Sequence, residues 1–99
     1  MIYLDYMATT PVDQRVVKAM LQCLDYNGVF ANPSAVHAYG KQANDLIERA
    51  RQQFADAIGM SAESIVWTSG ATESNNIAIL GAADFYQRQG KHIITCGTE

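Results

Sequence analysis

The sequence has few charges, few prolines and no long apolar run, and each shortage excludes a class of protein. Charged residues make up 17% of the 99 residues and the net charge is −3, so a basic surface for nucleic acid is not expected. There are two prolines, and apolar residues reach 48%, which indicates a globular rather than a disordered chain. No apolar stretch approaches the roughly 20 residues that a membrane-spanning helix needs, so no membrane partner is predicted.

Cysteine and histidine are equally sparse. Cys23 and Cys96 form no C-x-x-C pair, and with His37 and His92 they show no zinc-ligand spacing, so no metal site is predicted. We expect two reduced thiols that are buried or half-buried. The first residues lack the basic start and apolar stretch of a secretory signal, which favours a cytoplasmic protein.

Three helices are predicted from capping residues and apolar spacing. An extended arm over 1–10 should lead to a first helix over about 11–24, because Thr10 can cap and Pro11 suits the first helical position. Ser34 should cap a second helix over about 35–58, which Gly59 ends in a left-handed cap. Apolar residues three and four apart form a continuous stripe on this second helix. They are Val36, Tyr39, Ala43, Leu46, Ile47, Ala50, Phe54, Ala57 and Ile58.

The pattern changes from helical to β-rich after residue 64. Residues 65–68 and 92–95 predict two strands, with a third helix from Ala71 or Thr72 to Gln89 between them. Strand, helix and strand in about 30 residues predict a βαβ unit over 65–95 with two parallel strands. Because a parallel sheet needs helices on both faces, we predict an α/β chain, 1–99, that is a single incomplete domain.

The turn after the first predicted strand, residues 68–72, is the candidate binding site. Ligands of open parallel sheets bind beyond the carboxyl ends of the strands, and here a helix begins at that point. Free N–H groups and the helix dipole favour a phosphate there, with Gly70 allowing close approach and the Ser69 and Thr72 hydroxyls as donors. The alternative is a capped turn without a ligand. The turn has neither P-loop nor G-x-G-x-x-G spacing.

Three segments in order resemble the class V, fold-type I family of enzymes that use pyridoxal 5'-phosphate (PLP). Residues 3–11 (YLDYMATTP) resemble the opening arm of that family, and residues 32–40 (NPSAVHAYG) resemble its Asn-Pro-Ser-Ser-x-His-x-x-Gly segment. Residues 68–76 (TSGATESNN) resemble the PLP phosphate loop of the NifS/IscS-like cysteine desulfurases. Met7 and Ala35 depart from the family pattern. The resemblance spans nearly the whole chain and implies the N-terminal part of a fold-type I PLP-dependent transferase.

The resemblance implies roles for individual residues. Gly70, Ala71 and Thr72 match the positions that hold the PLP phosphate, and Asn32 matches a position on the substrate side. The alternative for Asn32 is a pre-proline loop residue that hydrogen-bonds its own backbone. His37 is expected to be a structural side chain early in the second helix.

No catalytic residue of the family has a match in this chain. Lys18, Lys41 and Lys91 lie in no segment like that of the PLP-binding lysine, and Cys96 is not in the loop of the sulfur-accepting cysteine. We therefore expect the 99 residues alone to be inactive and to retain no PLP. Glu73 is expected to be a first-turn carboxylate rather than a catalyst.

For the complete enzyme, the resemblance implies a homodimer that converts L-cysteine to L-alanine and enzyme-bound persulfide. Its acceptors are iron–sulfur scaffold proteins or sulfur carriers for tRNA thiolation. The alternatives are a selenocysteine lyase or an aminotransferase of the same class, and a non-catalytic truncated fragment that self-associates.

Overall fold

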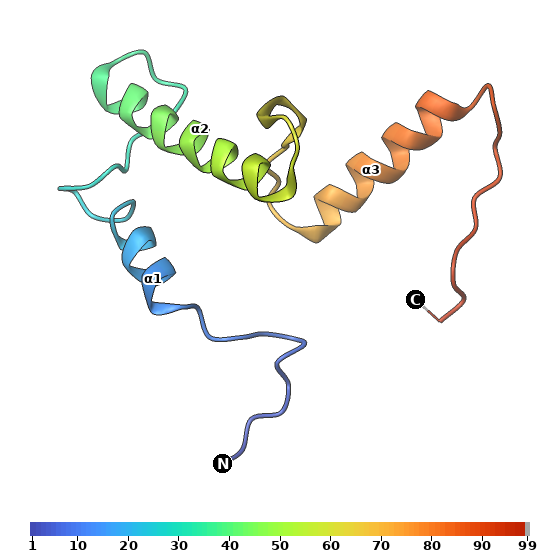
Figure 1. The fold of residues 1–99 in the computed structure, drawn as a ribbon, viewed down its shortest axis with the longest axis horizontal. Helices are drawn as coiled ribbons and strands as arrows, with labels where there is room; N and C mark the ends of the chain where they lie inside the picture. Colours follow the sequence, from blue (N-terminus) through green and yellow to red (C-terminus); the bar gives the residue numbers. More distant parts are fainter. Residues whose placement is uncertain (99) are drawn as a thin grey trace. The chain divides into compact units, whose positions relative to one another are not determined.

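The computed structural model describes residues 1–98, which form helices joined by loops (Figure 1). In chain order the elements are α1 (Gln14–Leu21), α2 (Ala38–Ile58), the 3-10 helix η1 (Ala62–Ser64) and α3 (Ala71–Tyr86). The chain divides into two compact units, Met1–Ile65 and Val66–Glu99, and α3 belongs to the second unit. Among these residues no helix combines the length and the apolar character needed to cross a membrane.

The predicted βαβ unit is wrong. Residues 65–68 and 92–95 form no strand, and neither does any other part of residues 1–98 (Figure 1). An isolated strand pair is marginal in water, and a parallel pair needs cover on both faces. The described residues of the second unit contain a single helix, α3. One helix can cover only one face of a pair of strands, so the other face would be open to solvent. The described chain is therefore helical, not α/β.

The first helix, α1, begins at Gln14 because its cap is Asp13 and not Thr10. Asp13 Oδ1 accepts from the Arg15 N–H at 2.8 Å, and Arg15 Nη2 lies 3.0 Å from Asp13 Oδ2. The Arg15 side chain, and then its backbone N–H, lower the pKa of Asp13. The Thr10 hydroxyl instead donates to the Tyr6 carbonyl at 3.0 Å and closes a turn within the arm. This outcome agrees with the general preference for aspartate over threonine as a cap.

The second helix, α2, begins at Ala38 rather than at residue 35, because His37 and not Ser34 is its cap. His37 Nδ1 accepts from the Gly40 N–H at 3.2 Å, so the proton of the neutral ring is on Nε2. Gly40 is buried, and a Cβ added there would lie 2.2 Å from the Ala35 carbonyl oxygen. The His-x-x-Gly spacing of the sequence is thus a capping arrangement in which the preceding turn packs closely on the helix.

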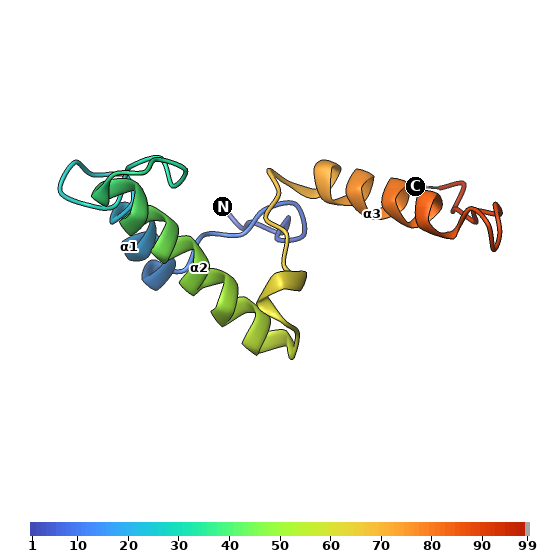
Figure 2. The ribbon, with the colours of Figure 1, turned by 90° about the horizontal axis from the view of Figure 1, so that it is seen from above.

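The left-handed cap predicted at the end of α2 is confirmed. Gly59 has a φ of 69°, and its N–H donates to the carbonyls of Ala55 and Asp56. The Met60 N–H also donates to the Ala55 carbonyl, at 2.9 Å, which completes the paired bonding expected when a helix ends on glycine. The turn brings η1 back against the end of α2, where Ala55 is fully buried (Figure 2).

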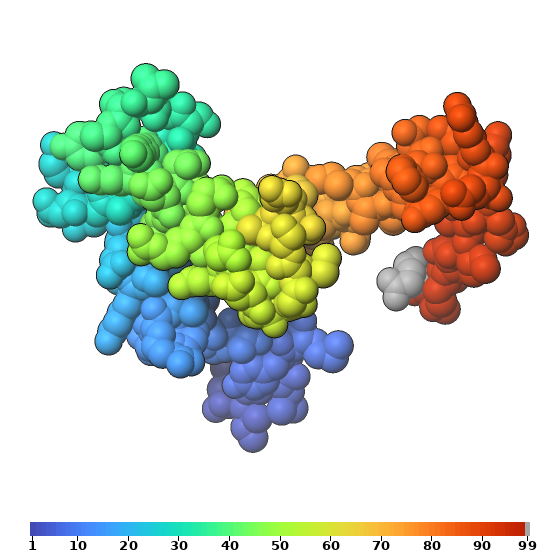
Figure 3. Space-filling model, turned by 45° about the horizontal axis from the view of Figure 1, so that its top comes forward, coloured from blue at the N-terminus to red at the C-terminus, as the bar shows by residue number. Residues whose placement is uncertain are grey.

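Little apolar surface is buried within either unit. In residues 1–98 the buried apolar side chains are Ala43 and Ala55. The apolar stripe predicted on α2 lies largely open, since Phe54 is 50% and Ile58 is 53% exposed, although Ala43 within the stripe is buried. α3 is apolar on every side over residues 77–83, and Leu80 is 64% exposed; Figure 3 shows α3, in orange, as a rod about one helix thick. Since such helices are ordinarily buried, both have side chains suited to a partner that the described residues do not supply.

Replacing His37 tests the cap of α2. His37→Ala should lower the stability of the helix by about 1 kcal/mol, whereas His37→Asn keeps a side-chain acceptor and should lose little. Far-UV circular dichroism and amide exchange at Gly40 measure both effects. Equal helicity and equal exchange in the two variants would show that the histidine ring is not the cap.

The open apolar stripe of α2 should make the isolated chain self-associate. Large exposed apolar patches are typical of interaction surfaces, and a charge within the stripe should weaken the contact. We expect the apparent mass in size-exclusion chromatography to rise with concentration, and to rise less in a Leu46→Glu variant. A compact monomer at high concentration would contradict this expectation.

Candidate functional site

The loop of residues 68–73 leads into α3 and contains three of the predicted site residues. Gly70 is the N-cap of α3 and no side chain makes a capping bond there. The Ser74 N–H donates to the Gly70 carbonyl at 3.1 Å, which begins the helical bonding. The N–H groups of Ala71 and Thr72 come before this bond and have no acceptor within the helix. The structure thus brings Gly70, Ala71 and Thr72 together at the positive end of the helix dipole.

Nothing in the described part of the chain requires glycine at position 70. The backbone is extended there, with a φ of 161°, which any residue adopts. A Cβ built on Gly70 meets no atom within 4 Å, in contrast to the crowded position of Gly40. What glycine does provide is unobstructed access to the N–H groups of the next turn. This access is what a bound anion would need.

Glu73 binds the residue that precedes the cap. Its Oε2 accepts from the Ser69 N–H and from the Ser69 hydroxyl, both at 2.7 Å. The backbone bond first, and then the hydroxyl bond, lower the pKa of the Glu73 carboxyl. The Ser69 hydroxyl was predicted as a phosphate donor, but here it donates to Glu73. The serine and glutamate on either side of a helix start, a pattern related to the capping box, could have indicated this contact.

Of the remaining hydroxyls near this helix start, two are bonded within the chain and one is available to a ligand. Thr68 Oγ1 lies 2.6 Å from Ser74 Oγ and also donates to the Gly70 carbonyl at 3.2 Å. The Thr72 hydroxyl makes no hydrogen bond within residues 1–98 and adds one donor to the N–H groups of the first turn. Backbone N–H groups with a hydroxyl at a helix start match the oxygens of a phosphate. The donor set of this loop therefore fits a phosphate group.

Asn32 lies in the first unit, in the turn before α2. Its Oδ1 accepts from the Ser34 N–H at 2.9 Å, and its carbonyl accepts from the Ala35 N–H at 3.0 Å. This is the local backbone bonding expected of a turn asparagine before proline. Because Asn32 belongs to a different unit from the loop of residues 68–73, its role toward a substrate stays a prediction.

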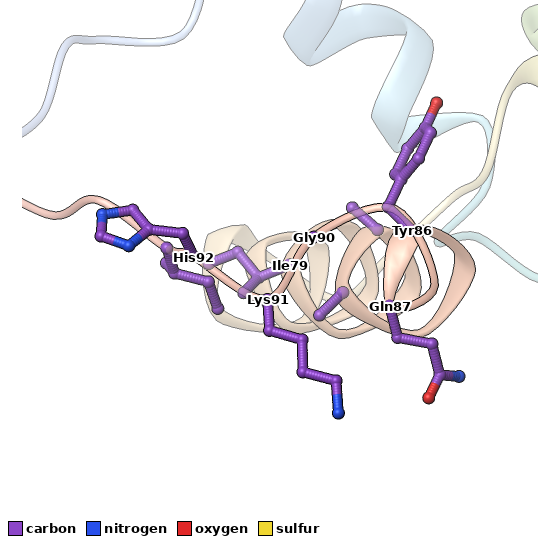
Figure 4. Close-up of a pocket in the computed structure, with 9 residues that line it drawn as sticks. Ile79, Tyr86, Gln87, Gly90, Lys91 and His92 are labelled. Atoms are coloured by element: carbon purple, nitrogen blue, oxygen red, sulfur yellow. The ribbon is translucent and has the colours of Figure 1, made fainter.

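An open pocket of about 530 Å³ lies along α3 and the segment that follows it. Lys91 and Gln87 extend to one side of the helix and Tyr86 to the other, so their polar ends do not converge (Figure 4). A catalytic site needs an acid, a base or a nucleophile directed at a common point. The pocket is instead an uncovered side of an apolar helix.

Both cysteines are free, and Cys96 is exposed whereas Cys23 is half-buried. The expectation that both thiols are at least half-buried is therefore wrong for Cys96. Its Sγ lies 3.0 Å from Thr98 Oγ1, and hydrogen bonding to Thr98, through the side chain first, lowers the pKa of the thiol. A hydroxyl contact supplies neither the base nor the cation that activates catalytic cysteines, so Cys96 is not assigned to the site.

Known proteins resemble the chain over its whole length. A family profile described as aminotransferase class-V matches residues 2–99. Three relatives, each named cysteine desulfurase IscS, are from Pseudoalteromonas translucida (59% identical), Proteus mirabilis (58%) and Haemophilus influenzae (59%). Each alignment covers 99% of this chain and 24% of the relative. The chain thus spans about a quarter of the length of the curated relatives that it matches.

Acid should release Ser69 from Glu73. The two bonds hold the pKa of Glu73 below the ordinary value of about 4.3, so their stabilising effect is complete above that pH and is lost as the pH falls through the lowered value. The Ser69 amide resonance should shift over that range in an NMR titration. Glu73→Gln should abolish the shift, and a shift that persists in this variant would rule out the contact as its cause.

Proposed function

Because the chain belongs to the aminotransferase class-V family, we propose that it is the N-terminal part of a PLP-dependent cysteine desulfurase. In this proposal the complete enzyme converts L-cysteine to L-alanine and keeps the sulfur as a persulfide. The observation that carries the proposal is the start of α3, where the N–H groups of Ala71 and Thr72 have no acceptor within the helix and lie next to an unobstructed Gly70. The names of the relatives support the same reaction.

Gly70, Ala71 and Thr72 hold the phosphate of PLP in this proposal. Ala71 and Thr72 donate their N–H groups, Thr72 adds its hydroxyl, and the dipole of α3 stabilises the negative charge. Glu73 is not a phosphate ligand, because its carboxylate accepts from Ser69. When bound, PLP supplies an electron sink for negative charge that develops on the substrate. The lysine that binds PLP and the cysteine that accepts sulfur come from sequence outside these residues.

The wider setting follows from the same proposal. Asn32 contacts the substrate, and the sulfur passes to iron–sulfur scaffold proteins or to carriers for tRNA thiolation. The enzyme is a homodimer, and the exposed apolar sides of α2 and α3 are surfaces for a larger domain or a second subunit to cover. Two free cysteines suit a reducing compartment such as the cytoplasm.

The test is an assay of the complete gene product. The purified protein should absorb as a PLP enzyme and form equal amounts of L-alanine and released sulfide from L-cysteine in the presence of a reductant. Activity on selenocysteine alone, or transamination without sulfur release, would identify a different member of the family. Residues 1–99 alone should release no sulfide, and PLP-dependent release by them would contradict the proposed division of the site.

Replacing Gly70 tests the phosphate loop itself. Gly70→Ala should change stability by less than about 1 kcal/mol, since the extended backbone and the free space accept a methyl group. The same methyl should obstruct the N–H groups of the next turn and weaken PLP binding about tenfold or more, a loss of about 1.4 kcal/mol.

Gly81→Ala is the matched control for this variant. Gly81 lies within α3 (Ala71–Tyr86) and outside its first turn, so the change should leave PLP affinity unchanged. Equal PLP affinity in the Gly70→Ala and Gly81→Ala proteins would show that the loop is not the phosphate site.

A further inference from the structure

Hydrogen bonds between Glu73 and Ser69 connect the two ends of the segment in which α3 begins. Glu73 lies in the first turn of the helix, and its Oε2 accepts from the Ser69 N–H and from the Ser69 hydroxyl, both at 2.7 Å. The three residues between the two partners are Gly70, Ala71 and Thr72. They are also the residues proposed to hold the phosphate, so the contact spans the proposed phosphate segment.

A second pair of side chains spans the same segment. Thr68 Oγ1 donates to the Gly70 carbonyl at 3.2 Å and lies 2.6 Å from Ser74 Oγ. Because the single hydrogen of the Thr68 hydroxyl goes to the carbonyl, Ser74 is the donor of the shorter bond. Both pairs lie within the second unit. The bonds to Glu73 are the stronger of the two contacts, because their acceptor is charged.

The charge of Glu73 would by itself oppose a phosphate. A carboxylate at a helix start is stabilised by the helix dipole, but it repels a second anion at the same start. In a capping box, a glutamate in the first turn bonds the N–H of the cap residue. Here Glu73 bonds Ser69, the residue before the cap Gly70. Any favourable effect of Glu73 on a bound phosphate must therefore come from the loop geometry that its bonds maintain.

We propose that Glu73 is a positioning residue that holds the loop of residues 68–73 in the shape that receives the phosphate of PLP. This inference rests on the proposed function and adds to it a residue that raises PLP affinity without contacting PLP. A loop that is already ordered loses less conformational entropy when a ligand binds. Loss of the two bonds should therefore raise the Kd for PLP about 3- to 10-fold.

Two substitutions separate the hydrogen bonds of Glu73 from its charge. Glu73→Ala removes both, whereas Glu73→Gln keeps an oxygen that accepts from Ser69 and removes the charge alone. The complete gene product is stripped of PLP and titrated with PLP, and the absorbance of the bound cofactor gives Kd. Glu73→Ala should raise Kd about 3- to 10-fold, and Glu73→Gln should stay within about twofold of wild type.

Pyridoxal, which lacks the phosphate, shows whether the effect acts through the phosphate. Its Kd should be the same in the Glu73→Ala and wild-type proteins, because the positioned loop contacts the phosphate alone.

Asp84→Ala is the matched control. Asp84 is also an exposed carboxylate of α3 that accepts from a side chain, Gln87, at 2.9 Å, but it lies in the last part of the helix. This variant should leave the Kd for PLP unchanged. If Glu73→Ala does not fold, Ser69→Ala replaces it, since it removes the hydroxyl bond and keeps the backbone bond. A smaller rise in Kd, for PLP and not for pyridoxal, is then expected.

The outcomes distinguish this inference from the proposed function. An unchanged or lower Kd for PLP in Glu73→Ala, an equal loss for pyridoxal, or a Glu73→Gln protein as weak as Glu73→Ala overturns the positioning role alone. A wild-type protein that binds PLP but does not act on L-cysteine overturns the proposed reaction and leaves the role of Glu73 standing. A wild-type protein that binds no PLP overturns both.

Discussion

Backbone N–H groups at the start of a helix need hydrogen-bond acceptors. Side chains supply such acceptors at the starts of α1 and α2 but not at the start of α3. α1 is capped by Asp13 and α2 by His37, in each case through a side chain two or three residues from the donor. α3 has no side-chain cap, although Glu73 and Ser69 bind each other directly beside its start. The carboxylate that could have satisfied these N–H groups is thus engaged elsewhere. Of these three helices, α3 is the one whose start has no side-chain cap, and this start is where the PLP phosphate is proposed to bind.

Such local hydrogen bonds are important for the stability of the helices because the chain buries few apolar side chains. With Ala43 and Ala55 as the buried apolar side chains of residues 1–98, the helices are held by their own backbone bonds, their caps and the turn at Gly59. The apolar sides of α2 and α3 contribute nothing to stability until they are covered. The exposed apolar sides of α2 and α3 are consistent with a chain that spans about a quarter of the length of its relatives.

The features of the fold that are set by residues close to one another in the sequence were largely predictable. Gly59 ends α2 as predicted, and the turn into α3 places Gly70, Ala71 and Thr72 at a helix start. The strands at 65–68 and 92–95 were wrong because strand formation depends on a partner and on cover for both faces, which β-rich sequence does not supply.

The cap residues predicted for the first two helices were wrong because several side chains near a helix start can accept a hydrogen bond. Small differences in free energy decide which of them does. Asp13 rather than Thr10 caps α1, and His37 rather than Ser34 caps α2, where its Nδ1 accepts from the Gly40 N–H. The bond from the Ser34 N–H to Asn32 Oδ1, by contrast, is the local backbone bonding that the sequence offered for an asparagine before proline.

The measurement that tests the central claim most directly is native mass spectrometry of the protein purified from cells that express its gene. The account predicts a polypeptide about four times as long as these 99 residues, since the chain covers 24% of its relatives, with PLP bound to each subunit. A mature product of 99 residues, or a longer product that carries no PLP, would contradict it.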